Sequence, residues 1–401
     1  MTREPQSERI VRFLRSRWFK IPAVLVGLVF LAGGAIFMSA WEAMGARPEG
    51  PRLVAMEASP QWKDGRFHNP LERIDGSYVK MLGDWFRGSS HRTPEVAPPV
   101  AARTRADYET PPPGGLRITW LGHSTTLVEI DGARVLLDPV WSTRAAPMTW
   151  AGPKRFHAPP LPLDELPPLD AVLISHDHYD HLDHRTIQAL AAVVPRFLVP
   201  LGVGAHLEYW GVDGDRITEL DWWDAVEVGP LTLTATPARH FSGRSLVMAD
   251  MNRTLWAGWA IRGPEHRVYY SGDTALFPGL TEIGARLGPF DAALIETGAY
   301  NKLWADVHIG PEQAVVACQM VGGAVLLPVH WGTFDLAIHS WIEPVERVLV
   351  AATRAGVPVA VPRPGQQVIP AEPPALVRWW EEIPWQRADV NPVISSGLED
   401  A

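Results

Sequence analysis

The sequence predicts an α/β fold in which two β-sheets pack face to face between outer helices, a four-layer αββα sandwich, with one membrane-spanning helix at the N-terminus. Two observations lead to this prediction. From residue 116 onward, short apolar runs come first in hairpin-like groups and then alternate with helix-like stretches, a mixture that suits two packed sheets covered by helices. Before them lies an uncharged apolar run that is long enough to cross a bilayer.

The N-terminal segment combines a basic stretch, residues 1–20, with the uncharged run at 21–41. About 20 apolar residues at roughly 1.5 Å each span a bilayer core of about 30 Å. Basic flanks stay in the cytoplasm, and the arginine-rich, alanine-rich composition indicates a GC-rich bacterial genome. We therefore expect a single-pass anchor in a bacterial inner membrane with the catalytic domain in the periplasm. A cleaved signal peptide is the main alternative, but Met38, Ser39 and Ala40 match a cleavage site poorly.

Residues 42–115 are rich in proline, glycine and charge and end in PPPGG, which predicts a linker. One amphipathic helix is expected within it, packed on the catalytic domain or facing the membrane, because apolar residues recur at helical spacing. These residues are Tyr78, Met81, Leu82, Trp85 and Phe86. Residues 371–401 are expected to form a peripheral C-terminal extension.

Residues 116–370 are expected to form the compact α/β domain. Strands are predicted at 117–121, 126–130, 134–138, 171–175, 196–200, 231–237, 255–261, 267–271, 291–296 and 324–329. Helices are predicted near 183–194, 278–287, 311–321 and 341–355. No internal repeat of short fixed period interrupts this order.

The apolar run AVLIS (171–175) leads directly into a dense group of candidate metal ligands. They are His176, His178, Asp180 and His181. A loop at the end of a rigid strand can turn several side chains toward one point, and imidazole with carboxylate suits zinc, and also iron or manganese. His184 lies one turn further on and is expected on the exposed face of a helix.

Three further candidates, His240, Asp273 and His330, each follow an apolar run. Because all three lie just past expected strand ends, we expect them to meet the first group at one edge of the sheet pair. The single cysteine, Cys318, rules out an intrachain disulfide and a cysteine-rich zinc site, and it is expected to pack in the core. The formal net charge of −9 argues against a general nucleic-acid binder.

The order HxHxDH, then His, Asp and His, resembles the metallo-β-lactamase superfamily of binuclear hydrolases. The resemblance implies a metallo-β-lactamase-type domain with two bound metal ions, most simply zinc. It implies that His176, His178 and His240 hold one ion, that Asp180, His181 and His330 hold the second, and that Asp273 bridges them. Two such ions bind a water between them, and a single zinc can lower a water's pKa to about 7 from 15.7. Asp180 and Asp273 would thus serve catalysis as well as metal binding.

A longer set of motifs resembles the N-acyl-phosphatidylethanolamine-hydrolysing phospholipase D family. The motifs are RFHNP (66–70), WLGHST (120–125), LLDPVWS (136–142), the run from GPKRF to HDHYDHLD (152–183), SGDT (271–274) and PVHWGTF (328–334). The resemblance implies a zinc-dependent phosphoric diester hydrolase that releases phosphatidic acid and an N-acylethanolamine, acts on a phospholipid or other small amphiphile at a membrane, and forms a homodimer.

Two stretches, 296–315 and 335–341, depart from that family where substrate-shaping loops are expected. A lactonase, a β-lactamase or another ester or amide hydrolase on the same site therefore remains an alternative. A metal-dependent nuclease is a third hypothesis, which the negative net charge of the chain disfavours. A non-catalytic scaffold is disfavoured by the intact ligand set.

Other residues near these motifs have expected roles in support or substrate contact. Asp138 is a candidate acceptor for a ligand imidazole N–H, or else a turn residue at a strand end. His123 and His308 are expected to contact substrate, with His308 the better candidate for protonating or stabilising a leaving alkoxide, or else both are structural. Trp304 and Trp331 flank site elements and could line an acyl-chain groove, whereas core packing is expected for most other tryptophans.

Overall fold

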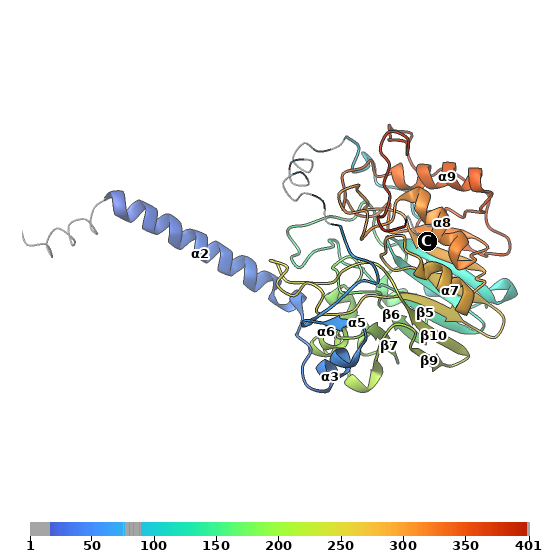
Figure 1. Ribbon diagram of the computed structural model, residues 1–401, viewed down its shortest axis with the longest axis horizontal. Coiled ribbons are helices and arrows are strands. Elements are labelled where there is room, and N and C mark those ends of the chain that lie inside the picture. The colour runs from blue at the N-terminus through green and yellow to red at the C-terminus, as the bar shows by residue number, and fades with distance from the viewer. Residues whose placement is uncertain are drawn as a thin grey trace, which may run out of the picture.

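The computed structural model describes residues 17–74, 76, 80, 83, 88 and 90–398. The residues of the expected amphipathic helix, Tyr78, Met81, Leu82, Trp85 and Phe86, lie outside this set. The first element, α2 (Arg17–Met44), extends from the domain as a single rod (Figure 1). Among the described residues it contains the one helix that is long and apolar enough to cross a membrane, at Val24–Met44. Its length and composition suit a membrane anchor or a signal sequence.

A seven-stranded sheet carries the N-terminal half of the domain. It starts as an antiparallel meander and continues with parallel strands, in the order β15-β3-β4-β5-β6-β7-β8. The strands are β3 (Leu116–Gly122), β4 (Thr125–Ile130), β5 (Ala133–Leu137), β6 (Ala171–Leu173), β7 (Phe197–Pro200), β8 (Ile217–Leu220) and β15 (Gln367–Val368).

A six-stranded sheet carries the C-terminal half, in the order β14-β13-β12-β11-β10-β9. The strands are β9 (Ala225–Val228), β10 (Leu231–Thr236), β11 (Gly258–Arg262), β12 (Arg267–Tyr270), β13 (Ala292–Glu296) and β14 (Leu326–Val329). Strands β9 to β12 are antiparallel neighbours, whereas β12, β13 and β14 are parallel. Strand β10 therefore runs in the same direction as β12 to β14.

Three apolar layers separate the two sheets and their helices. Val128 and Val135 face the second sheet, whereas their neighbours Leu127 and Leu136 pack beneath α5 (His184–Leu190) and α6 (Gly204–Tyr209). The outer face of the second sheet is covered by α7 (Gly279–Leu287), α8 (Pro311–Val321) and α9 (Glu343–Ala355) (Figure 1). The strands read as continuous apolar runs because both of their faces are buried. This arrangement confirms the predicted αββα sandwich.

Helix α8 shows how local sequence sets the helix ends. Pro311 occupies the first turn, where its missing N–H costs nothing, and Gly322, at φ 73°, ends the helix in the left-handed conformation. Cys318 is fully buried in this helix, which confirms the predicted core position. Short 3₁₀ turns lie at Arg105–Tyr108, Pro113–Gly115, Leu163–Glu165 and Gly214–Arg216.

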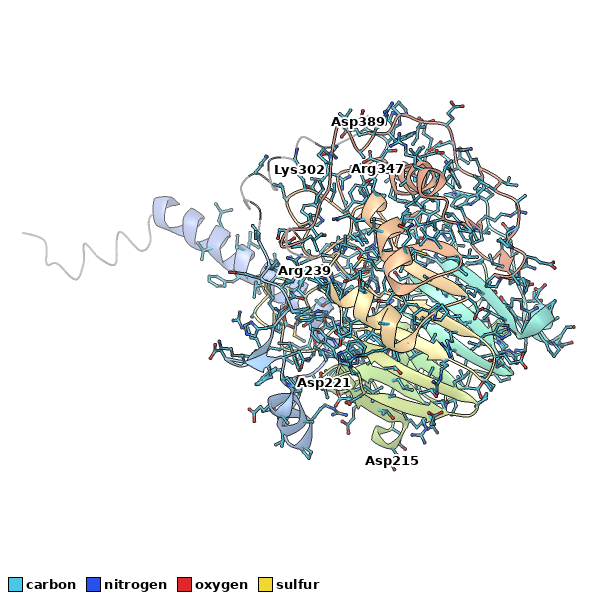
Figure 2. The ribbon with its side chains drawn as sticks, turned by 45° about the vertical axis from the view of Figure 1, so that its right-hand side comes forward. Asp215, Asp221, Arg239, Lys302, Arg347 and Asp389 are labelled. Atoms are coloured by element: carbon cyan, nitrogen blue, oxygen red, sulfur yellow. The ribbon has the colours of Figure 1, made fainter. Side chains whose placement is uncertain are left out.

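Part of the expected linker is fixed on the domain. It contains α3 (Pro51–Ala58) and a hairpin of β1 (Trp62–Lys63) and β2 (Arg66–Phe67). Phe67 is fully buried in the core between the sheets, and its N–H donates to Asn252 O at 2.8 Å. Arg239, labelled in Figure 2, donates to Glu72 O and Ser396 O at 2.8 and 2.9 Å. Segments from both ends of the chain thus meet beside His240.

Candidate metal centre

The predicted ligands lie at one end of the two sheets. Asp138 follows β5 and the loop at 176–181 follows β6, while His240, Asp273 and His330 follow β10, β12 and β14. These strands run in the same direction within each sheet, so their carboxyl ends share an edge, where binding sites of α/β sheets are commonly found. Strand direction therefore brings together residues that are far apart in the sequence.

Three histidines form the first group of ligand atoms. His176 Nε2 lies 2.9 Å from His178 Nδ1, and His240 Nε2 lies 3.3 Å from the same atom. The remaining nitrogen of His240, Nδ1, lies 2.7 Å from Val307 O. This carbonyl sets the ring orientation and leaves Nε2 to face the other two histidines, as the supporting partner of a metal-bound imidazole does.

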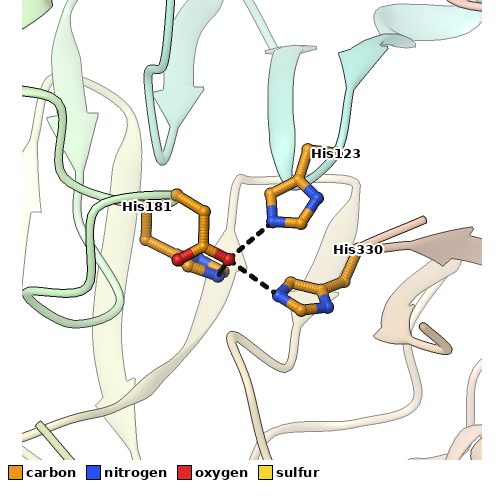
Figure 3. Close-up of side chains that lie close together, drawn as sticks. His123, His181 and His330 are labelled. Atoms are coloured by element: carbon orange, nitrogen blue, oxygen red, sulfur yellow. Dashed lines mark hydrogen bonds and ion pairs between the residues drawn. The ribbon is translucent and has the colours of Figure 1, made fainter. Parts of the chain in front are cut away.

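A second group surrounds the carboxylate of Asp180. Its Oδ2 atom lies 2.9, 3.2 and 3.4 Å from Nε2 of His123, His330 and His181. Figure 3 shows these three imidazoles converging on the one carboxylate oxygen. The sequence predicted His123 as a substrate contact. Its ring is 1% exposed and, like that of His308, lies in a group of side chains that could hold a metal ion.

The carboxylate of Asp273 joins the two groups. Its Oδ2 atom lies 3.1 and 3.2 Å from Nε2 of His330 and His181, in the second group. The same atom lies 3.7 and 3.8 Å from Nε2 of His240 and His176, in the first group. One oxygen thus faces four imidazole nitrogens, two from each group, which is the placement expected of a carboxylate that bridges two ions.

The charges of the site favour bound cations. Burial lowers the pKa of His176 and His240 well below the usual value, so both imidazoles stay neutral. Burial alone would raise the pKa of Asp180 and Asp273, but the adjacent His181 holds both far below the ordinary range. Burial alone would lower the pKa of His181 and His330, but Asp273 and Asp180 raise both, that of His330 to about 10. A bound cation would displace these two protons, since neutral imidazoles and deprotonated carboxylates are the forms that bind metals.

Two buried ligand atoms also lack a hydrogen bond. Among the described residues, His181 Nε2 and Asp273 Oδ1 make no hydrogen bond. A buried polar atom without a partner is costly, and an ion at the centre of the group would satisfy both. With no cysteine in the site, the donor set is nitrogen and oxygen only, which fits zinc as well as iron or manganese.

Asp138 supports the second group from behind. Its Oδ2 atom lies 2.7 Å from His181 Nδ1 and also accepts hydrogen bonds from the Ser175 and Tyr270 hydroxyls. Its Oδ1 atom accepts from Ser175 N at 2.7 Å. Four contacts hold this fully buried carboxylate in place, so it fixes the ring of His181 and leaves Nε2 to face Asp180 and Asp273.

Two supporting residues were missed by the sequence reasoning. Glu296, at the end of β13, contacts His308 Nδ1 through a short hydrogen bond and accepts from Thr274 N at 2.7 Å. Asn69 brackets the backbone of His240, donating to its carbonyl at 2.7 Å and accepting from its N–H at 2.9 Å. A lone carboxylate inside the apolar run DAALIE was the available signal for Glu296, since such a group needs a partner when buried.

His308 and two tryptophans were predicted to contact substrate. His308 borders the site, with Nδ1 3.8 Å from Asp273 Oδ2 and 15% of its side chain exposed. Trp304 lies on the same loop, and its Nε1 donates to Ala299 O. Trp331 is only 3% exposed and stacks on Trp120 with ring centroids 5.6 Å apart, so core packing is its main contact, although it borders a small cavity beside His330.

The expectation that His184 is exposed is wrong. It begins α5 and is 9% exposed, with its ring centroid 5.9 Å from that of Trp210. Trp210 is the residue that caps the C-terminal end of α6, so the ring of His184 lies beside the end of that helix.

Comparison with known proteins agrees with this geometry. Residues 133–331 match the family model described as the beta-lactamase superfamily domain. The chain belongs to the metallo-β-lactamase superfamily of metal-dependent hydrolases. It is 48% identical, over 88% of its own length and 97% of the relative's, to an uncharacterized protein of Mycobacterium tuberculosis. It is 37% identical, over 62% of its length and 73% of the relative's, to N-acyl-phosphatidylethanolamine-hydrolyzing phospholipase D 1 of Caenorhabditis elegans.

A solved structure shows the same fold. An isothiocyanate hydrolase from Delia radicum gut bacteria superposes with a TM-score of 0.50 at 21% identity, covering 63% of this chain and 98% of the other. At that identity the likeness concerns the fold alone. A shared fold does not select a substrate, so the reaction has to be argued from the residues of the site.

Proposed function

We propose that this metal-dependent hydrolase is a zinc phosphodiesterase of phospholipase D type, which cleaves N-acyl phosphatidylethanolamine to phosphatidic acid and an N-acylethanolamine. The observation that carries the proposal is the single Asp273 oxygen facing imidazoles of both ligand groups. When bound there, two divalent ions supply a nucleophile from water at neutral pH and offset the negative charge of a phosphodiester. The Caenorhabditis elegans relative supports the choice of substrate.

The chain's own residues suit the departure of an alkoxide. The contact between Glu296 and His308 Nδ1 orients the ring so that its second nitrogen, Nε2, can face a substrate. Burial and the neighbouring Asp273 raise the pKa of Glu296 well above its ordinary value, so its carboxyl group holds a proton. In the proposed step, Nε2–H gives its proton to the leaving oxygen while the Glu296 carboxyl proton moves to Nδ1. One proton enters the leaving alcohol and one leaves the carboxyl group, so the step balances. Proton transfer of this kind requires hydrogen-bond reach to the leaving atom.

A substrate panel tests the proposal. Purified full-length protein with measured metal content is assayed with N-acyl phosphatidylethanolamine in mixed micelles, a nitrophenyl phosphodiester, an acyl lactone and a β-lactam. We expect both phosphodiesters to be hydrolysed and N-acylethanolamine to be released from the lipid. The Asp180→Ala variant serves as the blank for adventitious activity. Turnover of the lactone or the β-lactam without either phosphodiester would instead establish the alternative hydrolase on the same site.

We also propose that α2 is an uncleaved anchor and that the catalytic domain lies in the periplasm. The basic residues before the apolar run support this orientation. A phosphatase that is active only in the periplasm, fused after Ala401, should be active in a bacterial host and remain with the membrane fraction. Soluble mature protein that begins near Trp41 would show a cleaved signal peptide. Membrane lipid is the expected partner, and nucleic acid is not. We also propose that the protein forms a homodimer, a proposal supported by the family resemblance alone.

A further inference from the structure

The domain end of α2 is tied into the catalytic domain. Residues 24–39 of the helix are exposed, whereas Ala40 and Ala43 are buried against the domain. Trp210 Nε1 donates to Glu42 O at 2.7 Å, and Arg244 donates to Ala43 O from Nη2 at 2.7 Å and from Nε at 3.0 Å. The last carbonyls of a helix have no partner within it, and here the domain supplies the donors.

The same guanidinium also holds the metal-ligand loop. Arg244 Nη1 donates to Leu182 O at 2.9 Å and to Asp177 O, carbonyls that lie on either side of the ligands Asp180 and His181. The Arg244 side chain is buried, and its charge lies over the ring of Tyr179 at 4.2 Å. A cation at a helix C-terminus is favourable. One side chain thus links the helix that can cross a membrane to the loop that carries the ligands.

An exposed apolar loop begins two residues after Arg244. Leu246, Val247 and Met248 are 41%, 81% and 39% exposed. The loop is held in place, because Asp250 accepts hydrogen bonds from Arg244 N and Ser245 N at 2.9 and 3.0 Å. Three consecutive exposed apolar residues on an ordered loop mark an interaction surface.

The loop continues an apolar surface that α2 begins. Phe37, Met38 and Trp41, in the last turns of the helix, are 43%, 70% and 52% exposed. The hydrogen bond from Arg244 to Ala43 O holds the start of the loop against the end of α2. The loop therefore lies beside the end of the helix where the chain enters the domain (Figure 1). Tryptophan at this position is typical of the boundary between membrane and water.

We propose that the last turns of α2 and the loop Leu246–Met248 form one membrane-contacting surface, whose partner is the interface of the bilayer that the helix crosses. Arg244 is a positioning residue in this arrangement, because it holds the ligand loop at a constant place relative to that interface. The inference rests on the proposal that α2 spans the membrane, and it does not depend on which amphiphile is cleaved.

The depth of the loop in a bilayer tests the inference. Full-length Val247→Cys protein is labelled with a nitroxide in vesicles of phosphatidylcholine and phosphatidylglycerol, and its collisions with oxygen and with a water-soluble nickel complex are compared. Val390→Cys is the matched control, because Val390 is also exposed, at 73%, and its neighbour Asp389 lies far from α2 (Figure 2). Val29→Cys reports on the helix itself. Burial raises the pKa of the Cys318 thiol to about 12, which keeps it unreactive.

We expect the label at Val247 to favour oxygen over nickel, as at Val29, while the label at Val390 behaves as a surface site in water. A label at Val247 as open to nickel as the one at Val390, with Val29 protected, would overturn the membrane-contacting surface but leave the anchor intact. Water-like behaviour at both Val29 and Val247 would overturn the anchor and this inference together. None of these readings depends on activity, so the outcome is separate from that of the substrate panel.

Discussion

Asp273→Ala is expected to abolish hydrolysis and to reduce the metal content of purified protein from about two ions per chain to well below one. The physical reason is that one carboxylate oxygen faces imidazoles from both ligand groups. Removing it would leave each group one anionic ligand short, and the repulsion between two bound cations would no longer be offset by a carboxylate between them. Metal analysis by mass spectrometry and turnover of a nitrophenyl phosphodiester check the two effects separately.

The control for this experiment lies at the other end of the same sheet. Asp291 precedes β13 and accepts from Arg267 N at 2.8 Å, so Asp291→Ala also removes a half-buried carboxylate contact but none from the metal centre. We expect that variant to keep both ions and most of its activity. An Asp273→Ala protein that retains full metal content would show that Asp273 does not bridge the ions. Equal metal loss in both variants would point to general unfolding instead.

The sequence was sufficient to predict the layers of the fold. Runs such as AVLIS and DAALIE are apolar on both faces, because each strand lies between the opposite sheet and a layer of helices. The short strands β8, β9 and β15 were not predicted. Their burial is mixed, as in the exposed–intermediate alternation of β9, so they carry no strong apolar pattern. Pairing with a neighbour defines them more than their own composition does.

The metal ligands that directly follow strands could be predicted from the sequence. The residues that orient them by hydrogen bonds from distant segments could not. His176, His240 and Asp273 could be recognised because each stands just past an apolar run. Asn69 lies 171 residues from His240 and sits in a stretch whose composition predicts a linker. The place of His123 beside Asp180 could not be predicted, because it depends on the turn between β3 and β4, which sequence spacing does not reveal. Its contact with substrate stays a prediction.

His308 provides the sharpest division between metal binding and proton transfer. It borders the centre and lies outside the predicted ligand set, and its Nδ1 is occupied by Glu296. His308→Ala should therefore keep both ions but lower kcat for N-acyl phosphatidylethanolamine, whose leaving alkoxide needs a proton. General acid–base assistance is typically worth about 10²–10⁴-fold. Glu296→Gln should give a smaller loss in the same direction, because the amide can orient the ring but cannot supply the proton.

The leaving group decides between a proton donor and a histidine that only packs. A nitrophenolate departs without a proton at neutral pH, so the loss caused by His308→Ala should shrink to a few-fold when a nitrophenyl phosphodiester replaces the lipid. Turnover of both substrates is measured alongside metal content, with wild-type protein of equal metal loading as the reference. Normal rates on both substrates would remove His308 from the mechanism, and equal losses on both would assign it to positioning. Loss of metal in the same variant would place His308 among the metal ligands. His308 would then belong to the metal centre and not to the residues that face the substrate.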